Sequence, residues 1–205
     1  MKKLIDLTKE EIGQLFPVEI TPYDALWAVL FAAERRRILA ALGPDVALRI
    51  EHFGSTSVPG LPAKDTIDIL VEIPPGPEGQ EQLIARMQGL GYDFMWQTDG
   101  APPYLVFVKG YDPAAPKAQT YHVHMGPQGH ALWDRLYFRD HLRQHPAVAE
   151  QYAQLKYALA EEHRHERVAY RVAKTDFVAR VTAEAKAHFG APARPDLPAS
   201  AGAEK

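Results

Sequence analysis

The residue types best suited to chemistry gather between positions 51 and 73. Residues 54–57 (Gly-Ser-Thr-Ser) form a small, hydroxyl-rich segment in which backbone N–H groups and hydroxyls can approach a phosphate closely. Asp68 follows within an apolar segment, where its carboxylate can hold a divalent cation that bridges to that phosphate. Lys64 supplies a positive charge between the two. Because Gly, Ser and Pro also dominate ordinary turns, the alternative interpretation is a purely structural turn.

Two histidines form a second candidate group. His122 and His124 stand two residues apart in segment 120–125, which we expect to be a strand, so their side chains should point to one face. With Asp68 nearby they would form a two-histidine, one-carboxylate metal site, which suits a transition metal such as Zn²⁺ or Mn²⁺ better than Mg²⁺. Either histidine is also a candidate general base near neutral pH. The alternative is that both only hydrogen-bond to neighbouring loops.

The elements that must position these groups follow from hydrophobic periodicity. Segment 66–73 is nearly all apolar, which predicts a central strand covered on both faces. The order of elements predicts an α/β protein of α+β-like character, with a mixed sheet of about five strands, helices packed on it and a helical C-terminal layer. Strands are expected over 48–53, 66–73, 92–96, 104–109 and 120–125. A turn near residues 99–100 is expected to join the strand at 92–96 to the strand at 104–109. Helices are expected over 21–43, 80–90, 131–143, from 146 onward, and 169–189.

The remaining segments are expected to be solvated or irregular. Residues 1–20 are predicted to be an extended lead-in and the charged run 34–37 a solvated helix face. His163 and His165, in the polar stretch 161–167, are expected to be solvated. We expect one domain over residues 1–190, followed by a disordered Pro/Ala-rich tail at 191–205.

Composition narrows the class of protein. The chain has 205 residues, 46% of them apolar, which is ordinary for one globular domain. A net charge of −3 predicts no general attraction for nucleic acid or for an anionic membrane. The absence of cysteine excludes disulfides, a thiolate nucleophile and a cysteine zinc site. No segment approaches the roughly 18 apolar residues of a membrane helix, so we expect a soluble cytoplasmic protein, with the oligomeric state left open.

Several motifs together resemble a known family. Residues 51–64 (Glu-His-Phe-Gly-Ser-Thr-Ser-Val-Pro-Gly-Leu-Pro-Ala-Lys), followed by Ile-Asp-Ile at 67–69, resemble the signature of the GrpB family. Other segments occur in the family's order. Residues 23–27 resemble its N-terminal helix, 121–124 its His-x-His strand, and 138–146 and 152–156 its C-terminal helices. Lys174 falls where a Tyr-x-x-Gly-Lys ending is common, with Ala173 in place of the glycine. The resemblance covers about residues 18–188.

This family is generally placed in the nucleotidyltransferase superfamily, whose pattern is a Gly-Ser or Gly-Gly turn, an Asp-x-Asp strand and a third acid on a later strand. Such carboxylates hold two Mg²⁺ ions, which align an attacking hydroxyl and stabilise the leaving pyrophosphate. The resemblance implies a metal-dependent nucleotidyltransferase that acts on a small molecule, with a nucleoside triphosphate and a divalent metal as cofactors. The residues expected to contact its phosphates are Gly54, Ser55, Thr56, Ser57, Lys64, Arg139 and Lys174. The catalytic and metal-binding residues would be Asp68, His122 and His124.

The pattern departs from the superfamily at the second acid. Leu70 occupies that position and cannot hold a metal. Glu72 shares its strand face but lies about 6–7 Å further along. The alternative function is therefore a non-catalytic module, on the same scaffold, that binds a nucleotide or another phosphate ligand. Nucleic-acid binding is disfavoured by the acidic pI of 6.3 and by the lack of a basic aromatic motif.

Overall fold

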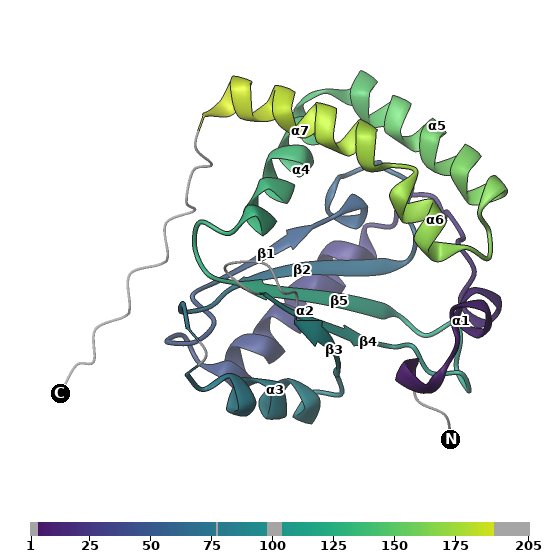
Figure 1. Ribbon diagram of the computed structural model, residues 1–205. Coiled ribbons are helices and arrows are strands. Elements are labelled where there is room, and N and C mark those ends of the chain that lie inside the picture. Colours follow the sequence, from purple (N-terminus) through teal and green to yellow (C-terminus); the bar gives the residue numbers. More distant parts are fainter. Residues whose placement is uncertain (1–3, 77, 98–103, 191–205) are drawn as a thin grey trace.

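A five-stranded mixed sheet forms the middle layer of the protein, whose computed structural model describes residues 4–76, 78–97 and 104–190 (Figure 1). The spatial order is β1-β2-β5-β4-β3, in which β2 and β5 are parallel and the other neighbouring pairs antiparallel. The strands are β1 (Arg49–Phe53), β2 (Thr66–Glu72), β3 (Asp93–Gln97), β4 (Leu105–Lys109) and β5 (Thr120–Gly126). The predicted α/β architecture with a mixed sheet of about five strands is confirmed.

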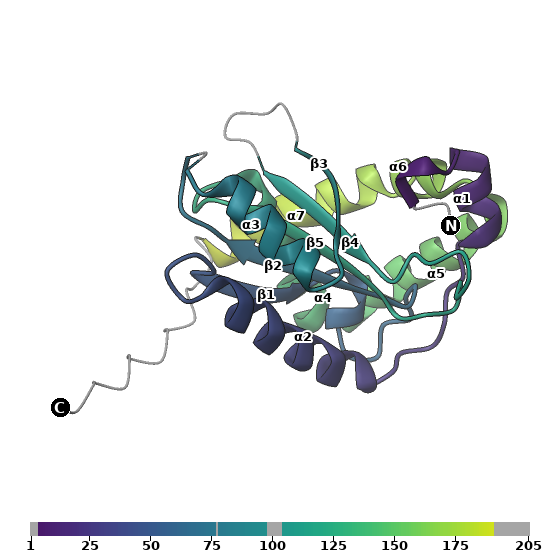
Figure 2. The same cartoon turned by 90° about the horizontal axis from the view of Figure 1, so that it is seen from below.

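Helices cover both faces of this sheet. Figure 2 shows α2 and α3 on one face, whereas the helices from α4 to α7 lie over the other. The first pair is α2 (Leu26–Leu42) and α3 (Gln80–Gly89). The C-terminal layer consists of α4 (Asp134–Gln144), α5 (Pro146–Glu162), α6 (Arg167–Val172) and α7 (Thr175–Phe189). The short helix α1 (Lys9–Leu15) lies at the side of the sheet next to α6, where His165 Nδ1 is 3.0 Å from the Gly13 carbonyl.

The two faces of β2 have different surroundings because successive side chains on a strand point in opposite directions. Ile67, Ile69 and Val71 are fully buried in the main core beneath α2 and α3. Leu70 points to the opposite face and is buried in a smaller apolar cluster that includes Leu132 of the turn before α4. The expectation that this strand is covered on both faces is thus confirmed.

Three expectations about element boundaries are wrong. Residues 9–15 form a helix within the predicted extended lead-in, because Thr8 and Glu11 make a reciprocal capping box. Helix α2 starts at Leu26 and not near residue 21, since Thr21 is held in a bridge with Ala63 by two backbone hydrogen bonds. The helix expected over 169–189 is split into α6 and α7, and Lys174 lies at the break.

The charged run at 34–37 is only partly exposed, as Glu34 is 2% exposed. Glu34 precedes the buried Ile38 by one helical turn and therefore faces the sheet. Its carboxylate accepts a hydrogen bond from the Tyr92 hydroxyl at 3.0 Å and forms an ion pair with Lys109. Arg35 and its two successors are exposed, as expected.

No helix in the described ranges is long and apolar enough to cross a membrane. The predicted turn at residues 99–100 and the predicted tail at 191–205 lie outside the described residues.

Replacement of Glu34 should destabilise the fold. Glu34→Ala leaves the Lys109 ammonium and the Tyr92 hydroxyl without their acceptor, and we expect a loss of about 3 kcal/mol in the free energy of unfolding. The matched control is Arg36→Ala on the exposed side of the same helix, which should change it by less than about 0.5 kcal/mol. Chemical denaturation of both variants tests this, and equal stabilities would contradict a structural role for the buried carboxylate.

Candidate functional site

The parallel pairing of β2 with β5 brings the predicted acid and histidines to one face. In this register Asp68 lies beside His122, and Leu70 beside His124. The Asp68 Oδ1 and His122 Nδ1 atoms are 3.6 Å apart, and each side chain keeps 26% exposure. The predicted proximity of Asp68 and His122 is therefore present in the fold.

The Gly-Ser turn packs directly against the Asp68 carboxylate. Gly54 follows β1 with φ of 72°, a left-handed conformation that favours glycine. A Cβ atom at this position would lie 2.2 Å from Asp68 Oδ2, so only glycine leaves room for the carboxylate. The turn then continues as a 3₁₀ helix, Ser55–Ser57.

The three hydroxyls after Gly54 have different environments. The Thr56 hydroxyl is buried, donates to the Thr66 carbonyl and lies 3.0 Å from His52 Nε2. The Ser57 hydroxyl donates to the Gly54 carbonyl at 2.6 Å. Both therefore stabilise the turn itself. Ser55 is the half-exposed member of the three, and its side chain is hydrogen-bonded to Tyr152.

Cations from three elements surround Asp68. Burial raises the pKa of Asp68 to about 6, and the positive charges of Lys64, Arg135 and Lys174 act in the opposite direction. Burial also lowers the pKa of Lys64 to about 7, with Arg167 and Lys174 contributing, and that of Lys174 to about 8. Near neutral pH the site thus combines one carboxylate with more than one positive charge.

An aromatic ring positions the two lysines. Tyr170 on α6 is 1% exposed, with the Lys174 ammonium 4.1 Å and the Lys64 ammonium 5.5 Å from its ring centroid. The break between α6 and α7 turns Lys174 back over the ring that lies one helical turn before it. Lys64 and Lys174 are half-buried, whereas Lys156 on α5 is buried and donates to the Pro62 carbonyl, and burial lowers its pKa to about 7.

His122 is hydrogen-bonded through one ring nitrogen, while the other lies 3.6 Å from Asp68 Oδ1. Its Nε2 lies 2.6 Å from the Tyr111 hydroxyl, which in turn accepts a hydrogen bond from Arg167 at 3.0 Å. Which of the two atoms donates depends on the tautomer of the imidazole. Burial, together with Lys64 and Arg167, lowers the pKa of His122 to about 3, so this ring is neutral near neutral pH.

His124 has an apolar and aromatic environment. Its ring packs edge-on against Phe53 and stacks on Tyr104, with centroid distances of 5.6 Å and 6.1 Å. Burial lowers its pKa well below the ordinary value. Its Nδ1 atom is buried and has no hydrogen-bond partner among the described residues.

These positions do not make a metal site with three protein ligands. Over the described ranges, no three His, Cys, Asp or Glu side chains are placed to hold one ion. Leu70, at the second acid position, is 1% exposed within an apolar cluster, and His124 stands beside it and not beside Asp68. The residues therefore do not fit the two-Mg²⁺ arrangement, and metal ligation by Asp68, His122 and His124 stays a prediction.

The sequence matches the GrpB protein family over residues 17–184. The chain belongs to the GrpB family. A UPF0157 protein of Pseudomonas aeruginosa is 45% identical over 83% of this chain and 68% of its own length. The UPF0157 protein YqkA of Bacillus subtilis is 38% identical over 74% of this chain, which spans only 43% of that protein.

The GrpB fold is also seen in a solved structure. The conserved protein GrpB from Enterococcus faecalis aligns with a TM-score of 0.71 and 32% identity, covering 82% of this chain and 96% of that one. The Cid1 poly(U) polymerase is a distant neighbour, with a TM-score of 0.40 and 12% identity over 73% of this chain and 46% of that chain. A likeness of that size carries no functional information about this GrpB protein.

Arg139, which the resemblance implied as a phosphate contact, has other partners in this GrpB protein. Its guanidinium donates to Glu51 and to the His52 carbonyl, each at 2.9 Å, and to Asp140. It joins β1 to α4, and its charge is not among those that act on Asp68. A phosphate contact at Arg139 stays a prediction, with Lys174 the better placed of the two.

Sequence reasoning missed several residues of this site. Arg167, in the polar stretch 161–167, was not singled out from the sequence, yet it donates to the Tyr111 hydroxyl and to the Phe16 carbonyl. The spacing of Arg167, Arg171 and Lys174 is helical in the sequence, but Lys174 lies beyond the end of α6, so this spacing alone does not place it with the other two. Arg135 carried no comparable signal, since its role depends on how α4 crosses the sheet.

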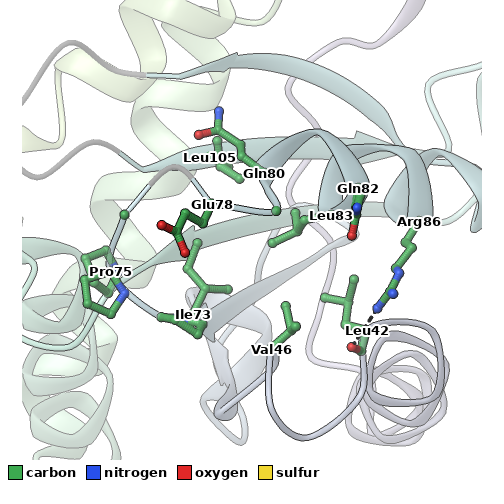
Figure 3. A pocket seen from close by; sticks show the side chains of 14 residues that line it. Leu42, Val46, Ile73, Pro75, Glu78, Gln80, Gln82, Leu83, Arg86 and Leu105 are labelled. Carbon is green, nitrogen blue, oxygen red and sulfur yellow. Dashed lines mark hydrogen bonds between the residues drawn. The ribbon is translucent and has the colours of Figure 1, made fainter.

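A separate cavity of about 380 Å³ lies elsewhere, between α3, the end of α2 and the loop after β2 (Figure 3). Its wall is mainly aliphatic, with Ile73, Val46 and Leu83 around the side chain of Glu78. None of the residues predicted to bind phosphate or metal lines it.

Gly54→Ala tests the contact between the turn and the carboxylate. The added methyl group would overlap Asp68, and we expect the variant to lose more than about 2 kcal/mol of stability from the backbone conformation and the clash together. Gly60→Ala is the matched control, because Gly60 has φ of 79° but nothing within 4 Å of an added Cβ. Thermal and chemical denaturation compare the two, and equal losses would show that the Asp68 contact is unimportant.

Proposed function

We propose that this face of the sheet is a binding site for a small molecule that carries phosphate. The observation that supports it is the convergence of Lys64, Arg135 and Lys174 on the single carboxylate of Asp68. One carboxylate neutralises one of these charges and leaves a surplus of positive charge. A phosphate group, with about −1.5 to −2 charge at pH 7, matches that surplus.

The turn after β1 completes the site. Gly54 leaves room for the Asp68 carboxylate, and the half-exposed Ser55, whose side chain is hydrogen-bonded to Tyr152, lies in the same turn. The lysines are held on Tyr170 before a ligand arrives, so little side-chain ordering remains for the binding step. Asp68 keeps the cations close together, because without it they would repel one another.

A divalent cation fits this proposal only if it binds together with the phosphate ligand. Mg²⁺ is commonly held by one or two carboxylates together with substrate phosphates. Asp68 offers one carboxylate, so metal affinity should depend on a phosphate compound being present. Zn²⁺ or Mn²⁺ on Asp68 and the histidines would instead bind without phosphate, which makes the two alternatives separable by metal titration.

Metal-dependent nucleotidyl transfer is the second candidate, and the contact between Gly54 and Asp68 favours it. Two observations oppose it: Leu70 is buried where a second acid would be needed, and the pKa of His122, near 3, makes a weak general base at neutral pH. Release of pyrophosphate from a nucleoside triphosphate and Mg²⁺, abolished in Asp68→Asn, would establish transfer and displace the binding-module proposal.

Lys174→Gln should weaken phosphate binding without unfolding the protein. A hydrogen bond to a charged group contributes about 1.5–3 kcal/mol, so the Kd for inorganic pyrophosphate should rise about tenfold or more. The matched control is Lys186→Gln on α7, which removes an exposed lysine paired with Asp134 and should leave the Kd unchanged. Isothermal titration calorimetry measures both, and an equal Kd in the two variants would refute the assignment of Lys174.

Binding should take up protons at pH 8. The free lysines have pKa values of about 7 and 8, so at this pH Lys64 is mostly neutral and Lys174 about half charged. A bound anion raises both values, and about one proton should be taken up in total. Calorimetry in two buffers of different ionisation enthalpy measures this uptake. Affinity should fall as the pH rises above 8, and pH-independent binding with no uptake would contradict a role for these lysines.

A further inference from the structure

The Arg135 guanidinium, on the first turn of α4, lies over the sheet face that carries Asp68. It is 5.3 Å from the centroid of the Phe53 ring, and Phe53 is the cross-strand partner of Asp68. Among the residues that the structure describes, Arg135 makes neither a hydrogen bond nor an ion pair. An arginine held against an aromatic ring in this way keeps its planar fork of N–H donors available for a bound anion.

His124 brings a second unused group to the same aromatic ring. Its imidazole packs edge-on against Phe53 with the centroids 5.6 Å apart, so it shares this ring with Arg135. Its Nδ1 atom is buried and has no hydrogen-bond partner within the described ranges. A buried polar nitrogen without a partner is costly, and a ligand that hydrogen-bonds to it removes that cost.

These two groups lie further along the strands than the lysines. Lys64 precedes β2, whereas His124 lies two residues beyond His122, which is the β5 partner of Asp68. Two residues of a strand span roughly 6–7 Å. The charge of Lys64 acts on His122, and that of Arg135 acts on both histidines. Asp68 therefore lies between a group of lysines and the arginine.

The face between these groups is accessible to solvent. Asp68 and His122 each keep 26% side-chain exposure, and Arg135 and His124 are half-buried. Burial nevertheless raises the pKa of Asp68 to about 6 and lowers that of His124. Side chains that stay accessible but have lost much of their bulk water can make strong hydrogen bonds to a ligand.

The charges at the two ends of this face suit different anionic groups. The lysine end, Lys64 and Lys174, has two cations beside Asp68 and is the part assigned to a phosphate above. The arginine end, Arg135 and His124, has one positive charge, because burial keeps His124 neutral. A carboxylate has one negative charge and can accept from the arginine fork and from a histidine N–H together.

We propose that the ligand is a phosphorylated carboxylic acid, with its phosphate at the lysine end and its carboxylate at the arginine end. This proposal rests on the phosphate-binding function proposed above and adds the second anionic group. Arg135 and His124 are then specificity residues, because a neutral group in place of the carboxylate leaves the guanidinium without an anion.

The first test compares two compounds that differ only in the second group. 3-Phosphoglycerate carries a carboxylate where glycerol 3-phosphate has a hydroxymethyl group. Calorimetry on the wild-type chain should show that 3-phosphoglycerate binds about tenfold tighter. Equal Kd values would overturn the proposal. Tighter binding of 1,3-propanediol bisphosphate than of 3-phosphoglycerate would also overturn it, because the second group would then be a phosphate.

Arg135→Gln should abolish this preference, so that the ratio of the two Kd values falls from about tenfold to about one. The variant should fold, as shown by thermal denaturation, because Arg135 has no hydrogen bond to lose among the described residues. Arg180→Gln, which removes an exposed arginine paired with Glu184, is the matched control and should keep the full ratio. A full ratio in Arg135→Gln would refute the arginine end.

His124→Phe tests the unpaired nitrogen separately. Phenylalanine keeps an aromatic ring against Phe53 but removes Nδ1, so the variant should be at least as stable as the wild type. The ratio of the two Kd values should fall by about threefold or more, the effect of one lost hydrogen bond. An unchanged ratio in the folded variant would refute the contact with His124.

Lys174→Gln separates this proposal from the phosphate site on which it rests. It should weaken both compounds by a similar factor and leave their ratio unchanged, because Lys174 belongs to the other end. If glycerol 3-phosphate binds, Lys174→Gln weakens it and 3-phosphoglycerate gains nothing, the phosphate site stands and the carboxylate proposal fails. If neither compound nor inorganic phosphate binds to the wild-type chain, the phosphate site itself is refuted, and this proposal with it.

Discussion

The charge balance around Asp68 is the constraint on which the candidate site depends. Its carboxylate is largely removed from water, which raises its pKa to about 6, and the nearby cations keep it ionised near neutral pH. The dependence is mutual, since burial lowers the pKa of Lys64 and Lys174 while Asp68 acts to raise both. Neither the acid nor the lysines would be stable as buried charges alone.

This balance links the C-terminal helices to the sheet. Lys64 comes from the loop before β2, whereas Arg135 lies on α4 and Lys174 at the break between α6 and α7. The cations are therefore brought to Asp68 only when the helical layer packs on the sheet (Figure 1). The opposite face carries its own ion pair, between the buried Glu34 and Lys109, so both faces combine apolar packing with paired charges.

Much of the fold could be predicted from the sequence because strands and helices leave periodic patterns. The all-apolar 66–73 segment correctly indicated a central strand, and two residues of spacing correctly placed His122 and His124 on one face. Side-chain partners carry no such pattern. Glu34 lies in a run of charges and is buried, and Arg167 lies in a polar stretch and reaches Tyr111, because both depend on contacts between segments distant in sequence.

Leu70 and His122 determine which chemistry the scaffold supports at this site. Leu70 occupies the place of a second acid and contributes to an apolar cluster with Phe53, so a carboxylate there would be a buried, unpaired charge. His122 is neutral and already hydrogen-bonded to Tyr111. One carboxylate, several cations and a glycine turn remain, and the anion-binding role proposed for these groups needs no transfer chemistry. The GrpB fold of this chain is thus better matched to recognition of a phosphate compound than to a two-metal reaction.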